Sequence, residues 1–153
     1  MGFPREEIVE KIRREYPVGC EVVLDRMEDV QAPPVGTRGT VKSVDDTGSI
    51  KVAWRTGGSL RVVYGEDACH RIDTDEMVKA FLDGYGKTQT GGQCPRCGNP
   101  MPHLERHAVS RRANLIVCDL CGTEEALEDA GMSEKKQMFT WAAWREAREH
   151  EGR

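Results

Sequence analysis

The chain has 153 residues, and its 22 basic and 26 acidic side chains give a formal net charge of -4 at neutral pH. Its hydrophobic content of 38% is that of a globular protein, and no apolar run approaches the length that spans a membrane. The net acidity excludes binding of nucleic acid through bulk positive charge, although a local basic patch is still allowed. The polar start of the chain shows no signal peptide, which predicts a cytoplasmic protein.

In chain order, residues 4–15 predict an amphipathic helix, and residues 18–72 change to the alternating pattern of short strands. We expect strands at residues 20–24, 39–44, 49–54 and 60–64, with hairpin turns around Gly48 and Gly57. A helix, a long loop and tightly turned antiparallel strands predict a small SH3-like β-barrel. Residues 74–83 predict a second flanking helix, with Thr74 as its N-cap.

This region also carries two longer motifs, Gly36-Thr37-Arg38-Gly39-Thr40-Val41 and Val44-Asp45-Asp46-Thr47-Gly48-Ser49-Ile50. On these motifs residues 5–73 resemble a bacterial domain of unknown function that is found largely in phages and integrative elements of Firmicutes. The resemblance implies no established activity. After Trp54 the family tends to have Asp-Asn-Gly, whereas this chain has the basic turn Arg55-Thr56-Gly57.

Two Cys-x-x-Cys-Gly motifs organise the second half of the chain, the first at Cys94 and Cys97 and the second at Cys118 and Cys121. Four thiolates at this spacing are typical of a tetrahedral zinc site in a zinc ribbon. Since cysteine fills all four positions, none is left for water or substrate, and we expect a structural Zn²⁺ ion. Redox dithiols or disulfides are the alternative for the same motifs.

The residues around these motifs strengthen the zinc interpretation. Residues 93–131 resemble small four-cysteine zinc-ribbon proteins of gut bacteria and their phages, and only the four cysteines carry over as functional residues. A strand at residues 115–117 is expected to enter the second motif. His103 and His107 are possible spare ligands, but four thiols already saturate the ion, so surface positions are favoured for both.

The predicted fold class is therefore α+β, with an SH3-like β-barrel and flanking helices, a four-cysteine zinc ribbon and a C-terminal helix. We expect residues 1–83 to form the first module, residues 84–92 a flexible linker, and residues 93–153 the ribbon with C-terminal helices. A short helix at 123–129 precedes a last helix that starts after Ser133. Apolar residues cover well over half of that last helix, so its aromatics must be buried somewhere. Packing within the chain and contact with a partner through Trp141 and Trp144 are both open.

One local basic cluster lies between the cysteine motifs and contains Arg106, His107, Arg111 and Arg112. It either contacts phosphates or neutralises the thiolates and pairs with Glu124 or Glu125. The first hypothesis is a non-enzymatic accessory or regulatory protein of a phage or mobile element that binds nucleic acid or a complex that processes it. The alternative is a protein-binding adaptor or inhibitor of a host defence or transcription complex that uses the aromatic last helix.

The sequence does not predict an enzyme, a small-molecule substrate or a membrane partner. It contains no glycine loop that cradles phosphate and no open metal position. Cys69 and His70 are the closest approach to a nucleophile and base, but adjacent residues seldom face each other. Cys20 is expected to be a small core residue on its strand.

Overall fold

The computed structural model describes residues 5–104 and 107–151, and it divides into two compact units. Unit 1 is Met1–Asp73 and unit 2 is Thr74–Arg153. The chain therefore passes from one unit to the next immediately before its second helix, and not at the expected linker of residues 84–92. Within the described ranges, no helix combines the length and the apolar character that crossing a bilayer requires.

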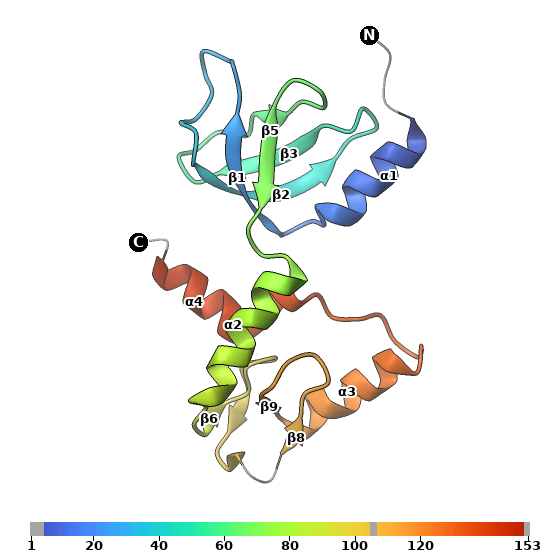
Figure 1. Ribbon diagram of the computed structural model, residues 1–153, viewed down its shortest axis with the longest axis vertical. Coiled ribbons are helices and arrows are strands. Elements are labelled where there is room, and N and C mark those ends of the chain that lie inside the picture. Colours follow the sequence, from blue (N-terminus) through green and yellow to red (C-terminus); the bar gives the residue numbers. More distant parts are fainter. Residues whose placement is uncertain (1–4, 105–106, 152–153) are drawn as a thin grey trace. The chain divides into compact units, whose positions relative to one another are not determined.

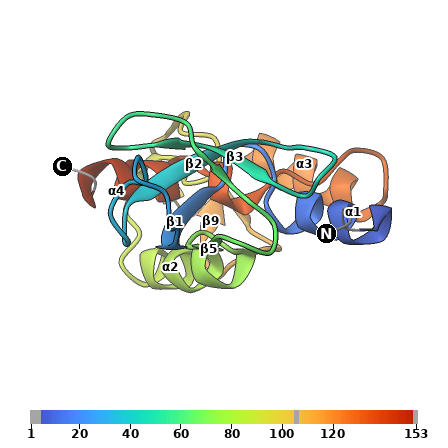
Figure 2. The same ribbon diagram turned by 90° about the horizontal axis from the view of Figure 1, so that it is seen from above.

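Unit 1 is a five-stranded antiparallel sheet with one helix. Helix α1 covers Glu6–Glu15, and the strands are β1 (Glu21–Arg26), β2 (Arg38–Val44), β3 (Ile50–Trp54), β4 (Arg61–Val62) and β5 (Ala68–Arg71). The strand order is β4-β3-β2-β1-β5, and the sheet is twisted, as the two views in Figures 1 and 2 show. The first helix and the four expected strands are confirmed. Strand β5 was not predicted, because it has no alternating hydrophobic pattern.

The core of unit 1 follows the two-residue period of its strands. On β3, Val52 and Trp54 are buried while Lys51 is exposed. The indole Nε1 of Trp54 donates a hydrogen bond to the carbonyl oxygen of Leu60 at 2.9 Å. Gly39 lies opposite Trp54, and a Cβ atom there would lie 2.4 Å from Cγ1 of Val52. The glycine of this motif therefore gives the two buried side chains their room.

The sheet is not shown to close on itself. Among the residues that the structure describes, β4 pairs only with β3, and β5 pairs only with β1. The two outer strands thus remain edges, and the expected SH3-like barrel is not confirmed. What the structure shows is a mixed α and β protein with a mostly antiparallel sheet.

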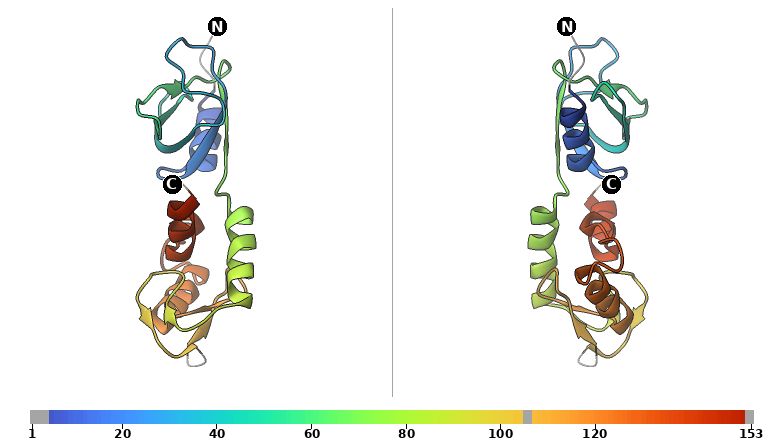
Figure 3. Two further views of the ribbon diagram at one scale, coloured as in Figure 1. Left: turned by 90° about the vertical axis from the view of Figure 1, so that its left-hand side faces the viewer. Right: turned by 90° about the vertical axis from the view of Figure 1, so that its right-hand side faces the viewer.

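Unit 2 places helices around a small module that contains the four-cysteine group. Its helices are α2 (Asp75–Lys87), α3 (Asp119–Asp129), the 3-10 helix η2 (Met138–Thr140) and α4 (Ala142–Glu151). Its strands form two short hairpins, β6 (Gly92–Gln93) with β7 (Pro100–Met101) and β8 (Ala108–Val109) with β9 (Ile116–Val117). Helix α2 packs on η2 and α4, and α2 and α4 lie side by side in Figure 3.

The expected linker is part of unit 2. Helix α2 was expected to end at Asp83, but it continues to Lys87. Gly86 lies against the backbone of Asn114, since a Cβ atom would fall 1.8 Å from the Asn114 carbonyl oxygen. The side chain of Gln89 then donates to the carbonyl oxygen of Ile116 and accepts from its amide, at 2.7 and 2.8 Å. These contacts hold the segment against strand β9.

The C-terminal region also differs from the expected single helix. Residues 133–137 are not helical, η2 follows, and α4 begins only at Ala142. Because the backbone changes direction at Trp141, apolar residues on both sides of the bend are buried without one helix presenting them all. The apolar residues of this region covered well over half of the circumference when they were placed on one ideal helix. The bend explains that result, because they belong to two separate helices.

Candidate metal centre

The four cysteines come from two different kinds of local structure. Cys94 and Cys97 lie in the turn between β6 and β7, where the Gly98 amide donates to the Cys94 carbonyl oxygen at 2.8 Å and Gly98 has φ of +81°. Cys118 is the N-cap residue of α3, and Cys121 lies in its first turn. The second motif is therefore a helix start and not a second knuckle. Helix α3 begins at Asp119, four residues before the expected start at Thr123.

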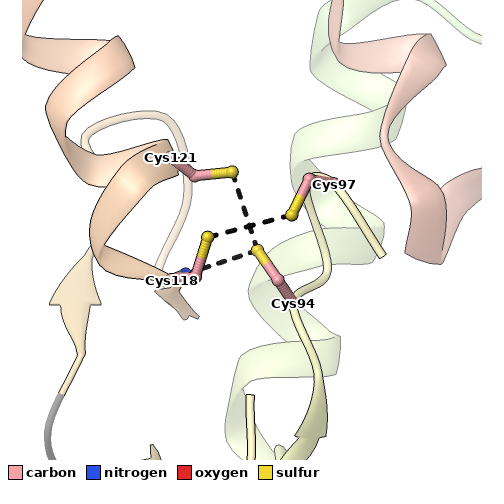
Figure 4. Close-up of side chains that lie close together, drawn as sticks. All are labelled: Cys94, Cys97, Cys118 and Cys121. Atoms are coloured by element: carbon pink, nitrogen blue, oxygen red, sulfur yellow. Dashed lines mark hydrogen bonds between the residues drawn. The ribbon is translucent and has the colours of Figure 1, made fainter. Parts of the chain in front are cut away.

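The sulfur atoms converge on one point, as Figure 4 shows. The Sγ atoms of Cys94 and Cys121 lie 3.8 Å apart, as do those of Cys97 and Cys118, and all four lie within 4.8 Å of one another. A tetrahedron with metal–sulfur bonds of about 2.3 Å has sulfur–sulfur edges of about 3.8 Å. All four cysteines are free thiols, and the distances are far longer than a disulfide bond. The group therefore fits one tetrahedral metal ion.

Backbone amides support negative charge on two of the sulfurs. The Cys118 amide donates to Cys94 Sγ at 3.3 Å, and the Asn99 amide donates to Cys97 Sγ at 3.5 Å. Burial by itself raises the pKa of Cys94, but amide donation, first of all from Cys118, outweighs it and holds that pKa below its usual value. Burial is the largest cause of the raised pKa of Cys97 and of Cys121.

Arg96, inside the first motif, is buried beside the thiols. It is 2% exposed and forms ion pairs with Glu124, with Glu125 at 3.6 Å and with Glu128 at 2.8 Å, all three from α3. Burial lowers the pKa of Arg96, but Glu124, the Cys121 sulfur and Glu128 raise it well above its usual value. Arg96 therefore keeps its charge and joins the knuckle to helix α3.

The acidic partners of Arg96 are bound from the other side as well. Glu125 is fully buried and accepts hydrogen bonds from Ser110 Oγ at 3.0 Å and from the Arg111 amide at 2.6 Å. Glu128 accepts from Arg112 at 3.0 Å and from the Lys136 amide at 2.9 Å. The sequence had named Glu125 as a possible partner of the arginine cluster, but it did not predict the ion pairs of Arg96 or the part of Glu128. The spacing of three residues between these two glutamates on one helical face was the available signal.

The described members of the expected basic cluster, His107, Arg111 and Arg112, each lie close to a carboxylate of α3. Arg106 lies outside the described residues, and His107 lies 3.7 Å from the carboxylate of Asp119. Arg111 pairs with Asp129 at 3.4 Å, and Arg112 pairs with Glu128 and Asp129 at 3.0 and 2.8 Å. Both arginines thus have acidic partners on α3. The Arg111 amide also donates to Glu125, one of the two carboxylates named by the pairing alternative. His103 is exposed.

Trp141 and Trp144, for which packing within the chain and contact with a partner were both open, are buried side chains of unit 2. Their exposed fractions are 0% and 9%. Trp144 packs edge-on against Phe81 of α2 with ring centroids 5.4 Å apart, and Arg96 lies 6.0 Å from the Trp141 ring centroid. The burial of both indoles corresponds to packing within unit 2, the first of the two alternatives that the sequence left open.

The remaining cysteines do not form a reactive site with His70. Cys20 is fully buried in the core of unit 1. Burial raises the pKa of Cys69 to about 12, so its thiol stays protonated at neutral pH. Successive side chains on a strand point to opposite faces, and His70 Nδ1 contacts Asp25 at 2.9 Å. The pair therefore lacks the geometry of a nucleophile and its base.

Comparison with known families covers unit 1 alone. Residues 5–72 match the family described as Domain of unknown function (DUF4314). The matched range contains α1 and all five strands of the sheet, and it ends before α2. A comparison with curated proteins found no match. The four-cysteine group thus lies outside the part of the chain that the family describes.

Proposed function

We propose that the chain is a non-enzymatic, zinc-binding accessory or regulatory protein that acts by binding nucleic acid or a complex that processes it. One observation carries the proposal: four thiols from a knuckle and a helix start lie at the spacing of a closed tetrahedral site. A site with four protein ligands has no position for substrate, so the ion shapes a binding module. Its place in a phage or mobile element rests on the resemblance of unit 1.

Zinc is the metal that this ligand set favours. Four cysteine sulfurs select soft or borderline metals, and tetrahedral four-sulfur sites hold either zinc or iron. Reduced thiols at this density suit the cytoplasm, where structural zinc sites are common. The order of knuckle, hairpin and helix supports a finger of the treble-clef type. In unit 1, the order β4-β3-β2-β1-β5 supports a coiled sheet related to SH3-like barrels, which mostly bind other macromolecules.

The metal assignment and the binding assignment are tested separately. Elemental analysis of protein purified without added metal is expected to give one zinc per chain, and iron or no metal would refute the zinc site. Affinity capture from a lysate with nuclease treatment of half the sample then tests the partner. Nucleic acid, proteins lost on nuclease treatment, or a nuclease-resistant complex of nucleic-acid-processing proteins are expected, whereas an identical set of unrelated proteins in both halves contradicts a nucleic-acid role.

A protein-binding adaptor is the second candidate function, and different residues now favour it. With Trp141 and Trp144 buried, the exposed apolar residues of unit 2 include Leu120 and Leu127 on α3 and Val109 on β8, with exposed fractions of 65%, 39% and 71%. Leu120 and Leu127 are two helical turns apart and share a face. Loss of captured proteins in Leu120→Glu, with zinc content unchanged, would favour the adaptor.

A further inference from the structure

The outer face of strands β2, β3 and β4 carries a row of positive charge. The register places Ser43 opposite Lys51 and Lys51 opposite Arg61. The ladder is irregular between Val41 and Ser43, so Lys42 lies at the bulge beside this row. The side chains of Lys42, Lys51 and Arg61 are all exposed, whereas the alternate residues Val41, Val52 and Val62 are buried. The three cations therefore share the solvent side of the sheet.

This placement is unfavourable in the isolated protein. Lys51 and Arg61 are like charges directly opposite each other on neighbouring strands, which destabilises a sheet. Among the residues that the structure describes, neither Lys42 nor Lys51 has an ion pair, and Arg61 has only Asp45, at 3.7 Å. The contrast with unit 2 is clear, since Arg96, Arg111 and Arg112 all have carboxylate partners there.

A second basic row lies farther along the same face. Arg38 on β2 and Arg55 after β3 are adjacent, because the Arg55 amide donates to the Arg38 carbonyl oxygen at 2.9 Å. Both share one carboxylate, Glu21, at 4.0 and 3.3 Å. Arg38 is four residues from Lys42 on β2, and Arg55, just after β3, is four residues from Lys51. Four residues of strand place the two rows about 13 Å apart. Only the small side chains of Thr40 and Ala53 come between the rows on these strands.

We propose that this cationic face, made of Arg38, Lys42, Lys51, Arg55 and Arg61, binds the phosphate backbone of a nucleic acid. The inference rests on the proposed function and names its contact surface, which the sequence had assigned to the arginines of unit 2. Two rows about 13 Å apart match a polyanion of repeated charge better than a single phosphate. A polyanion that spans both rows would also relieve the repulsion between Lys51 and Arg61.

The chemistry of the face favours nucleic acid over an acidic protein. Specific protein interfaces have an apolar core with enriched aromatic residues inside a polar rim. Between the basic rows there are only a threonine and an alanine, so an acidic protein would find charge there without an anchor. Contacts to phosphate oxygens need only the cations and carry no base specificity. Binding is therefore sequence-tolerant and weakens steeply with salt.

Fluorescence anisotropy with labelled single-stranded and duplex DNA of about 20 nucleotides tests the proposal with the zinc-loaded full chain. The charge-removal variant combines Lys42→Gln, Lys51→Gln and Arg61→Gln. Its matched control combines Arg14→Gln, Lys79→Gln and Lys135→Gln, three exposed cations elsewhere in the chain. We expect the first variant to bind at least about tenfold more weakly at about 50 mM salt and to flatten the salt slope by about 2 to 3. The control should bind as the wild type does.

Each other result has a definite meaning. Equal binding by both variants overturns the cationic face, while the proposed function stands. No binding of wild-type protein to either DNA at low salt overturns the cationic face as a nucleic-acid contact, whereas the proposed function is refuted only if the lysate capture also yields neither nucleic acid nor a complex that processes it. Stronger retention on polyglutamate or on anionic vesicles than on DNA overturns the choice of nucleic acid. An unchanged indole resonance of Trp54, which is buried under this face, shows that the charge-removal variant is folded.

Discussion

Arg96 Nε lies 3.6 Å from the carboxylate of Glu125, and both side chains are almost completely withdrawn from solvent. Arg96 lies between Cys94 and Cys97 in the first cysteine motif. Glu125 lies on α3, the helix whose start carries the second motif. Burying either charge alone would carry a large desolvation penalty. The opposite charge and the surrounding hydrogen bonds offset that penalty. The pair therefore acts as a second connection between the two ligand-bearing segments, next to the metal site.

Replacing Arg96 by methionine removes the cation but keeps much of its volume. Glu125 would then be buried without its positive partner, and we expect a loss of about 3 kcal/mol in the free energy of unfolding. Urea denaturation of zinc-loaded protein measures it. Lys79→Met is the control, since it breaks an exposed pair with Asp83 on α2 and should cost less than about 0.5 kcal/mol. Equal losses in both variants would contradict a special role for Arg96.

Metal removal should unfold one unit and spare the other. Structural zinc contributes on the order of 10 kcal/mol in small domains, and unit 2 holds the cysteine group. After chelation we expect fast amide hydrogen exchange in β6 to α4 and unchanged protection in β1 to β5. Cys97→Ser should reproduce the pattern without chelator, whereas Cys20→Ser should leave the metal content unchanged. Uniform loss of protection across both units would refute a metal effect confined to unit 2.

Two glycines of α2 should respond to alanine in opposite directions. A Cβ atom at Gly86 would clash with the Asn114 backbone, whereas nothing lies within 4 Å of the position at Gly84. Gly86→Ala should therefore destabilise unit 2 by at least about 2 kcal/mol. Gly84→Ala should stabilise it by about 0.5–1 kcal/mol, because alanine favours the helix. Thermal unfolding of both variants gives the comparison, and the same sign for both would exclude the docking of α2 described above.

Asp45 gives unit 1 a dependence on acid. Burial raises its pKa, but hydrogen bonds from Thr47 and Ser49 outweigh burial and hold the pKa below the usual value. A depressed folded-state pKa contributes stability that is present above the unfolded-state pKa of about 4 and is lost as pH falls through the folded value. Asp45→Asn should therefore cost about 1 kcal/mol at neutral pH, a difference that shrinks below about pH 4.

Native-state hydrogen exchange of the β3 amides measures the Asp45 effect separately from unit 2. Asp46→Asn is the control, because the neighbouring carboxylate is fully exposed and pairs only with Arg13 among the described residues. Asp46→Asn should differ from wild type in stability by at most a few tenths of the Asp45→Asn effect at any pH. A constant difference between Asp45→Asn and wild type from neutral pH down to about pH 3 would show that the charge does not matter.

The parts of the fold that sequence predicted are those with strong local signals. The alternation around Val52 predicted the strands, the N-cap Thr74 predicted the start of α2, and the paired motifs predicted the cysteine group. The helix beginning after Cys118 was missed, because a Cys-x-x-Cys-Gly motif is compatible with a knuckle or a helix start. The end of α2 was misplaced, because Gly84 and Gly86 weaken a free helix, whereas here contact with Asn114 requires the second of them.

The candidate sites show the same division. The four cysteines that could hold a metal ion follow from residue type and spacing alone, whereas the ion pairs of the arginines depend on which carboxylates the fold brings near them. Arg112 meets Glu128 and Asp129 through tertiary packing, and Lys51 meets Arg61 through strand register. Neither relationship is visible in local sequence. The nucleic-acid contact was therefore assigned to unit 2, where acidic residues of α3 pair with Arg111 and Arg112.

Thr74 is the N-cap of α2 and directly follows the last residue of unit 1. This position determines where a shortened polypeptide that contains only unit 1 should end. A fragment that stops at Asp83 would carry most of a helix without the residues that cover Val78 and Leu82, both fully buried in the whole chain. Such a fragment would expose an apolar stripe on its last helix, and we expect it to self-associate. Ending the shorter polypeptide at Asp73 avoids that hazard and keeps the carboxylate that accepts the Glu21 amide at 2.9 Å.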